Sequence, residues 1–353
     1  MDFEASQFVG YIETLRHGKI IGWCASRYHS DPIQCELVFG DTSAAQTTAN
    51  IHRADLEDLG FNQGYHGFEF DLRALDLDKL MSAKWWPVIV RIIETNIVLP
   101  LTCFSPFLSE DKFKYHHPYL ANFFTPEQRL YIYDKSIGFV FRAIINDQFY
   151  GPGLIWQRHE AEYNAVIDLK YADYATQEGE FQLTFSVNKT TLYSLTFSII
   201  PGSEVGHKAA YVIFIGGFQG RPKCRDQFKI ALQITKDMHP NIMLMLSLQA
   251  LGQSWGLETI AAVCAKQQLS ARSPELLTRL EHVYDQFWLN FGGTQLTADG
   301  NVFFMSTTPR AKPKDSNSHR QRAVKRLAAR NAVYSQILDN LGQHSGNRTR
   351  LAG

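Results

Sequence analysis

The sequence predicts an α+β protein, with a small all-β domain followed by a mixed α/β domain whose central sheet is mostly antiparallel. Short strands broken by turn residues fill residues 8–105, and two alternating strands at 181–200 flank a short polar turn. An almost wholly apolar strand at 211–218 precedes helix and strand patterns that extend to 306. We expect domains at 1–105, 106–310 and 311–353, the last a basic linker and helix.

The first domain is predicted to hold five strands. They are expected at 8–12, 19–24, 34–39, 67–72 and 86–94. Gly22-Trp23 and the glycine-punctuated block 53–70 are similar to a β-sandwich accessory module fused to bacterial glycosyltransferases and other envelope-assembly enzymes. Trp23 and Phe68 suit the core of such a sandwich. Because no nucleophile is grouped with a base here, we interpret this domain as a packing or docking module.

The second domain begins with a predicted helix, capped by Thr125 with Pro126 at its first position. Strands are then expected at 165–169, 181–187, 192–200 and 211–218. A buried helix over 241–255 ends at Gly256 and leads to a strand at 257–264. A helix over 276–289 and a strand pair at 294–296 and 302–306 close the domain.

Composition narrows the classes of function. Thirty-five basic residues balance 35 acidic ones, so the whole molecule has no field that selects a polyanionic partner. The five cysteines are scattered and include no Cys-x-x-Cys pair, which argues against a disulfide framework and a zinc site. The first residues lack a basic leader with an apolar run, and no apolar run is long enough for a membrane span. We therefore expect a cytoplasmic protein.

Six sequence blocks in order resemble the VirK/YbjX family of bacterial proteins over about residues 110–340. The blocks are Leu192-Tyr-Ser-Leu-Thr-Phe197, Phe214-Ile-Gly-Gly-Phe-Gln-Gly220, Ile234-Thr-Lys-Asp-Met-His239, Ile260-Ala-Ala-Val263, Tyr284-Asp-Gln-Phe-Trp288 and Asn290-Phe-Gly-Gly293. The resemblance implies a link to virulence and to resistance against antimicrobial peptides. It does not define a biochemical activity.

The order of elements is also similar to the GNAT acyltransferase superfamily. That likeness implies that strand 211–218 splays from strand 258–264, with the pantetheine arm of acyl-CoA or of an acyl carrier protein between them. The helix after Pro240 would present its N-terminal amides to a pyrophosphate. Such a site needs an open, amide-lined groove, whereas paired strands with a filled gap would exclude it. The implied reaction is acyl or aminoacyl transfer to an envelope component or a peptide.

His239 is the candidate catalytic residue. At a helix start the positive end of the macrodipole disfavours its protonated form, which suits a neutral general base. The alternative is a capping histidine that is hydrogen-bonded locally. The stretch Ala265-Lys-Gln-Gln-Leu269 replaces an Asn and a His that relatives carry, which weakens the enzymatic interpretation.

The residues expected to bind a cofactor lie on both sides of His239 in the sequence. They are Gly216, Gly217, Gln219, Arg221, Lys223 and Asn241. No metal site is expected. Glycine pairs within a strand mark a bulge or a close approach to the backbone. Arg221 and Lys223 suit a phosphate or an acidic carrier surface, and equally a solvated loop. Glu178, Glu180 and Asp285 are interpreted as isolated carboxylates.

Residues 310–330 form the one strongly basic region, with eight Lys or Arg and one acid. A helix here would place Val324, Leu327 and Tyr334 on one stripe. Its basic face would suit an anionic membrane surface, an acyl carrier protein or another protein partner, or simply solvent. Nucleic acid is the least favoured partner, because no aromatic residues interleave with the basic ones.

Three classes of function therefore stay open. The first is a transferase that uses a thioester donor. The second is a non-catalytic regulator or adaptor that recruits partners through the β module and the basic helix. The third is a subunit that is active only in complex with a partner.

Overall fold

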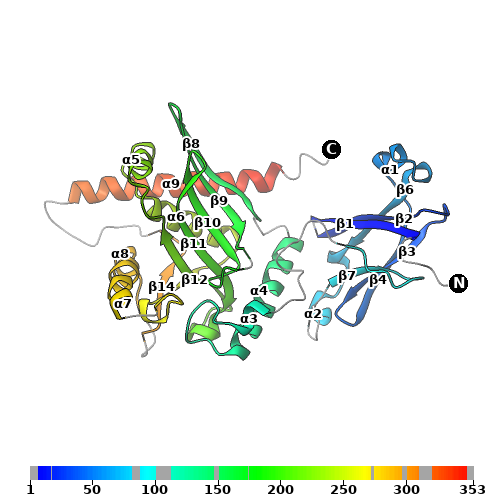
Figure 1. Cartoon of the computed structure of the whole chain (residues 1–353), viewed down its shortest axis with the longest axis horizontal. Helices are drawn as coiled ribbons and strands as arrows, with labels where there is room; N and C mark the ends of the chain where they lie inside the picture. The colour runs from blue at the N-terminus through cyan, green and yellow to red at the C-terminus, as the bar shows by residue number, and fades with distance from the viewer. Residues whose placement is uncertain are drawn as a thin grey trace. The chain divides into compact units, whose positions relative to one another are not determined.

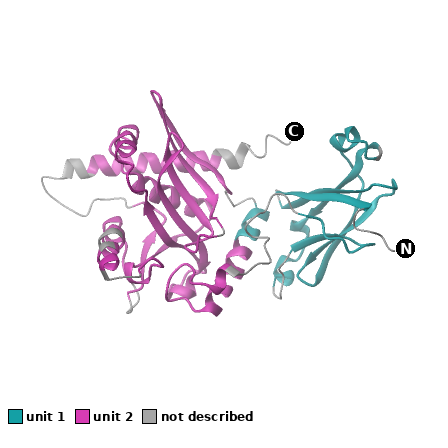
Figure 2. Cartoon of the chain, in the orientation of Figure 1, with its two compact units in different colours: residues 1–111, 140–148 teal, residues 112–139, 149–353 magenta. Residues whose placement is uncertain are grey.

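A computed structural model describes most of the chain. The described residues are 7–16, 18–81, 88–100, 113–146, 151–173, 175–271, 274–295, 300–309 and 320–347. The chain divides into two compact units (Figure 2). Unit 1 comprises residues 1–111 and 140–148, and unit 2 comprises residues 112–139 and 149–353.

Unit 1 is built from two antiparallel sheets (Figure 1). The first has the order β1 (Phe8–Arg16), β2 (Lys19–Ser26), β6 (Tyr65–Asp71) and β5 (Ile51–His52). The second has the order β4 (Thr42–Ala49), β3 (Ile33–Phe39) and β7 (Val88–Ile92). The predicted all-β domain is confirmed, and Trp23 and Phe68 are buried in it as expected. The sequence does not predict β4, because its Thr- and Ala-rich residues lack the apolar alternation of a half-buried strand, or β5, because two residues are too short to show a pattern.

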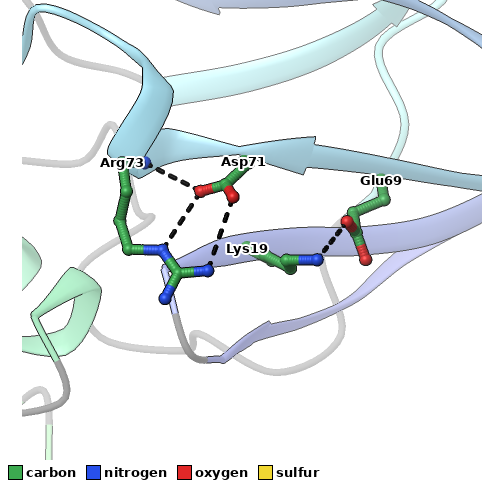
Figure 3. A network of polar contacts seen from close by, with 4 residues as sticks. All are labelled: Lys19, Glu69, Asp71 and Arg73. Carbon is green, nitrogen blue, oxygen red and sulfur yellow. Dashed lines mark hydrogen bonds and ion pairs between the residues drawn. The ribbon is translucent and has the colours of Figure 1, made fainter.

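Short helical segments connect the strands of unit 1. They are α1 (Ala54–Asp58), η2 (Asn62–Gly64), η3 (Leu72–Ala74) and α2 (Leu77–Leu80). A polar network lies where β2 meets β6 (Figure 3). Lys19 Nζ lies 2.5 Å from Glu69 Oε1, and the Arg73 backbone N–H donates to Asp71 Oδ1 at 3.0 Å. These side chains are partly exposed, so we assign them to surface pairing rather than to a site.

The core of unit 2 is a seven-stranded sheet with the order β14-β13-β12-β11-β10-β9-β8. Its strands are β8 (Gly153–Glu160), β9 (Tyr163–Tyr171), β10 (Phe181–Val187), β11 (Thr190–Pro201), β12 (Tyr211–Gly220), β13 (Thr259–Val263) and β14 (Val302–Ser306). All neighbours pair antiparallel except β12 and β13, which are parallel. This confirms the α+β class with a central, mostly antiparallel sheet.

Two helices precede this sheet, α3 (Phe113–His116) and α4 (Pro126–Ile145). The predicted start of α4 is confirmed by a capping box. The Gln128 N–H donates to Thr125 Oγ1 at 3.3 Å, and the Thr125 N–H donates to Gln128 Oε1 at 3.0 Å. The last residues of α4 belong to unit 1, where Phe141 packs edge-on against Phe39 and Arg142 lies 2.6 Å from Asp78.

The parallel crossover from β12 to β13 contains α5 (Arg225–Ile234) and α6 (Pro240–Ser254). Helix α6 is buried along most of its length and contacts both the sheet and the C-terminal helix α9 (Arg320–Asn347). Pro240 begins α6 and Gly256 follows it at φ 71°, as predicted. Helix α5 was not predicted, because Arg221, Lys223 and Arg225 read as the residues of a charged loop.

The segment between β13 and β14 holds η5 (Ala265–Gln267), α7 (Pro274–Leu280), a π-helical turn η6 (Glu281–Asp285) and α8 (Gln286–Phe291). The single helix expected at 276–289 is therefore interrupted by a π turn that contains Tyr284. Such turns are rare and are frequent at functional sites. Of the expected strand pair, the second strand is present as β14, and the first is reduced to an isolated antiparallel bridge between Thr294 and Phe304. Residues 296–299 lie outside the described residues. Within the described chain, no helix combines the length and apolar character needed to cross a bilayer.

Candidate functional site

His239 caps the N-terminus of α6. Its Nδ1 lies 2.8 Å from Asn241 Oδ1, and the Asn241 backbone N–H donates to Nδ1 at 3.4 Å. The ring stacks on Phe228 and meets Tyr193 edge-on, with centroids 5.8 Å away in both cases. This partial desolvation lowers the pKa of His239 below its ordinary value, against a smaller opposing effect of Asn241. This shift favours the neutral imidazole over the protonated one.

The first turn of α6 has no free backbone donor. Pro240 carries no N–H, the Asn241 N–H is bonded to the His239 ring, and the Ile242 N–H donates to the His239 carbonyl at 2.9 Å. These amides are thus engaged within the chain, and their binding of a pyrophosphate stays a prediction.

A cavity of about 470 Å³ lies beside His239, between the start of α6 and helix α9. Its walls are Lys236, Asp237, Met238, His239, Ile242, Lys325, Arg326, Ala329 and Arg330. Four of these side chains are cationic and one is acidic. None of the four cations has a carboxylate within ion-pair distance in the described part of the chain. We call this the basic cavity.

Helix α9 is fixed against the domain by apolar and polar contacts. Ile337 and Leu341 are buried, Tyr334 Oη donates to Gln253 Oε1 at 2.6 Å, and Trp156 Nε1 donates to Gln336 Oε1 at 3.2 Å. Arg330 is partly buried by this docking. Burial, and then the neighbouring charge of Arg326, lower the pKa of Arg330 below its ordinary value. The basic cavity thus gathers four cations that form no ion pair with a carboxylate among the described residues.

A second polar region lies where β12 and β13 separate. The two strands pair only from Ile213–Ile260 to Ile215–Ala262, although β12 continues to Gly220. On the other side of β12 the register with β11 slips by one residue, which leaves Gly216 as a bulge. We call the space beyond the last pair the β12–β13 gap.

The chain's own side chains fill this gap. Glu178 Oε1 accepts hydrogen bonds from Gln268 Nε2 at 2.7 Å and from Gln219 Nε2 at 3.0 Å. The Phe218 backbone N–H donates to Tyr284 Oη at 2.9 Å, and Gln268 Nε2 lies 3.5 Å from the Gly216 carbonyl. Strand β13 itself ends at Val263, one residue after its last pair with β12, so splayed strands over an open, amide-lined groove stay a prediction.

Burial dominates the electrostatics of the β12–β13 gap. It raises the pKa of Glu178 above the usual 4.5, and the hydrogen bonds from Gln268 and Gln219 only partly offset this rise. The pKa of Tyr284 is raised by burial and then by the charge of Glu178. A carboxyl group and a phenol with raised pKa values thus converge on the backbone of β12.

The glycine pair has a direct structural cause. A Cβ on Gly216 would collide with the Glu178 carbonyl and lie 2.9 Å from the Leu120 carbonyl. A Cβ on Gly217 would collide with the Glu178 carboxyl group. The expected bulge and close approach are both present, and the approaching group is Glu178.

A family model described as a protein of unknown function, DUF535, matches residues 103–337. The chain belongs to this family, which is the VirK/YbjX family. The matched segment contains His239, the β12–β13 gap and the cations of α9, whereas residues 1–102 lie outside it. No curated protein matches the chain.

In this VirK/YbjX-family protein, the predicted site residues fall into separate places. His239 lines the basic cavity, and Asn241 contacts the His239 ring without being among the lining residues. Gly216, Gly217 and Gln219 lie around Glu178. Arg221 and Lys223 are exposed in the connection from β12 to α5 and line neither region. Tyr193 links the two regions, since its ring packs against both His239 and Phe218.

The reading of three carboxylates as isolated is wrong. Glu178 binds two glutamines, and Asp285 Oδ1 accepts from the Ala265 N–H at 2.8 Å. Glu180 is buried and lies 3.0 Å from Lys114 Nζ, with Tyr119 Oη donating to it at 2.6 Å. Glu178 and Tyr284 were missed as site residues because their partners lie tens of residues away. Gln268 could have been found, since it lies in the 265–269 stretch already noted.

Proposed function

We propose that this VirK/YbjX-family protein binds a phosphate-bearing anion in the basic cavity. The observation that carries the proposal is a cavity of about 470 Å³ lined by four cations that have no carboxylate partner in the described part of the chain, Lys236, Lys325, Arg326 and Arg330. That volume lies in the range of small-molecule sites. Lys and Arg supply the charge-assisted hydrogen bonds that phosphate oxygens accept.

Side chains rather than helix amides would hold the anion. The first-turn amides of α6 are already used by His239, so only the field of the helix contributes there. Arg326 and Arg330 lie one turn apart on α9, at spacing i and i+4, and reach the same cavity. Two planar guanidinium groups so placed suit the several oxygens of a phosphate or pyrophosphate.

The ligand class includes several sources that share this chemistry. Coenzyme A, the phosphopantetheine of an acyl carrier protein and an anionic lipid headgroup all carry phosphate. Of the three classes of function, the adaptor class needs only this binding. The association of relatives with antimicrobial-peptide resistance favours a ligand of the cell envelope, and we extend that association to this chain as part of the proposal.

The test is equilibrium binding of inorganic pyrophosphate, coenzyme A and phosphatidylglycerol vesicles to the full chain. We expect Arg326→Gln with Arg330→Gln to weaken binding about tenfold or more. Lys170→Gln with Lys208→Gln removes the same charge from exposed positions outside the cavity and should change binding less than about twofold. The probe that binds shows whether the phosphate comes from a free anion, from coenzyme A or from a lipid headgroup.

Failure of all three probes to bind the wild-type chain would refute the proposal. Equal weakening by both double variants would also refute it, since it would mean that general charge rather than the basic cavity attracts the anion. The proposal further requires that added salt weakens binding, because the contacts are ionic.

Acyl transfer is a second candidate, supported by Glu178 and Tyr284 beside the part of β12 that extends past its last pair with β13, on condition that the side chains filling the β12–β13 gap move aside. Glu178, with its raised pKa, suits a base for an amine acceptor, and the Tyr284 hydroxyl suits donation to a leaving thiolate. The thioester arm would have to displace the Glu178–Gln268 contact. His239 as general base stays a prediction, with Nδ1 engaged by Asn241.

Thiol release from acyl-CoA and from an acyl carrier protein thioester, with an amine or peptide acceptor, tests this candidate. We expect Glu178→Gln to lower the rate about 100-fold and Gln219→Ala, as a neighbouring control, far less. Absence of release by the wild-type chain, alone and with candidate partner subunits, would remove acyl transfer from consideration. Anion binding at the basic cavity would be unaffected by that outcome.

A further inference from the structure

Two buried thiols meet inside unit 1, far along the chain from the basic cavity and the β12–β13 gap. Cys24 Sγ and Cys35 Sγ lie 3.2 Å apart, and both residues are fully buried. Cys24 lies on β2, a central strand of the four-stranded sheet, and Cys35 lies on β3, the central strand of the three-stranded sheet. The two sulfur atoms therefore meet where the two sheets of the sandwich face each other.

The surroundings allow this close approach. Gly10, on the strand next to Cys24, has no side chain, and a Cβ there would lie 2.7 Å from the Cys24 Cβ. A disulfide bond has a length of about 2.05 Å, so the sulfur atoms need to move by only about 1 Å to form one. Side-chain rotation within a packed core can supply a shift of that size more readily than backbone movement.

The other cysteines do not offer such a pair. Cys224 and Cys264 are buried in unit 2, and neither contacts a second sulfur among the described residues. Cys103 lies outside the described residues. The described part of the chain also contains no group of three or more His, Cys, Asp or Glu side chains placed to hold a metal ion. The contact between Cys24 and Cys35 is thus best explained as a pair of thiols rather than as part of a metal site.

We propose that Cys24 and Cys35 form a reversible disulfide that links the two sheets of unit 1 when the chain meets a disulfide oxidant. With oxidised glutathione, one cysteine thiolate attacks a glutathione sulfur and releases one glutathione thiolate. The second cysteine thiolate then attacks the mixed disulfide and releases the other. The cysteines lose two protons and two electrons, and one oxidised glutathione becomes two reduced ones.

Burial determines the kinetics of this reaction. In the folded unit the Cys35 hydrogen bond, and then burial, raise the pKa of the Cys24 thiol, so its thiolate is scarce. Oxidation should therefore proceed through local opening of the sandwich, slowly at first and faster in mild denaturant. Once formed, the buried disulfide should resist reduction for the same reason.

The experiment uses the full chain carrying Cys103→Ser, Cys224→Ala and Cys264→Ala, so that only the pair remains. The protein is incubated with oxidised glutathione at a low urea concentration and then alkylated under denaturing conditions. Its intact mass is measured by mass spectrometry. We expect a mass lower by two hydrogen atoms, no alkylation and no glutathione adduct. The melting temperature of unit 1 should rise by about 10 °C when the disulfide forms and should fall back to its original value on reduction.

The matched control adds Cys35→Ala, which should leave Cys24 as a glutathione adduct or a free thiol. Because that variant changes the core, peptide mapping of the oxidised wild-type chain provides an independent readout, a linked pair of peptides that contain Cys24 and Cys35. Stable glutathione adducts on both cysteines, or full alkylation of both after oxidation, would overturn the proposal. So would an intramolecular link that involves Cys103, Cys224 or Cys264 instead.

Discussion

The basic cavity and the β12–β13 gap differ in how their charges are satisfied. In the gap, Glu178 is bonded to Gln219 and Gln268, and Tyr284 is bonded to the backbone of β12. The basic cavity is lined by four cations that have no carboxylate partner among the described residues. Polar groups that are hydrogen-bonded to one another are explained by the fold alone. Several unpaired cations around one cavity instead favour the binding of an anionic ligand. This difference is why anion binding is our first proposal and acyl transfer the second.

The largest effect is expected at the bulge of the β12–β13 gap. Gly216→Ala would drive a Cβ into the carbonyl groups of Glu178 and Leu120, which are backbone atoms and cannot rotate away. We expect the free energy of unfolding to fall by about 3 kcal/mol, measured by urea denaturation. Gly342→Ala on α9 is the control, because its added Cβ meets nothing and helix propensity should raise stability by about 0.5 kcal/mol. If Gly216→Ala left the free energy of unfolding unchanged, the β12–β13 gap would not be packed as described.

Removal of Gln268 tests whether the gap is a satisfied cluster. Gln268→Ala takes away the 2.7 Å hydrogen bond to Glu178 and leaves a largely buried carboxyl group with fewer donors. We expect a loss of about 2 kcal/mol in the free energy of unfolding. Gln233→Ala, at an exposed position on α5, should change it by less than about 0.5 kcal/mol. Equal effects of the two substitutions would contradict the role given to Gln268.

Glu178 should leave a signature in the pH dependence of stability. Its pKa is raised in the folded state, so the folded chain binds a proton more readily than the unfolded chain. Its contribution is present below about pH 4.5 and is lost as the pH rises through the folded pKa. Relative to Glu178→Gln, the wild-type free energy of unfolding should therefore decline with rising pH in this window. Parallel pH profiles from urea titrations of the two proteins would show that Glu178 has an ordinary pKa.

The smallest effect on stability is expected at the basic cavity, and its sign is opposite. Arg330→Gln removes one of several crowded cations, so we expect the free energy of unfolding to stay level or rise by about 0.5 kcal/mol. Pyrophosphate should raise the melting temperature of the wild-type chain more than that of this variant. A marked loss of stability in Arg330→Gln would mean that the arginine has a structural partner, and the contrast between the two regions would disappear.

Local signals in the sequence predicted local features of the fold. Thr125 and Pro126 mark the start of α4, and Pro240 with Gly256 brackets α6, because capping depends on neighbouring residues alone. Asn188 and Lys189 adopt positive φ in the turn between β10 and β11, where a polar turn was expected. The charged residues around α5 concealed a helix, since its amphipathic pattern is short.

The candidate sites depend on contacts that spacing does not reveal. Glu178 and Gln268 are 90 residues apart, and Lys236 and Arg330 meet only because α9 docks on α6. The sequence marked His239 and the basic helix separately, and nothing in either segment indicated that they share a cavity. Cys24 and Cys35 likewise looked scattered until the two sheets of unit 1 brought their sulfur atoms together.

Helix α4 has a consequence for the order of folding during synthesis. Its final residues belong to unit 1, where Phe141 meets Phe39 and Arg142 meets Asp78. The N-terminal unit is therefore discontinuous in sequence, and a nascent chain cannot complete it until the ribosome has passed residue 148. A fragment cut near residue 105 would keep strands β1 to β7 but lose the α4 residues that pack against Phe39 and pair with Asp78.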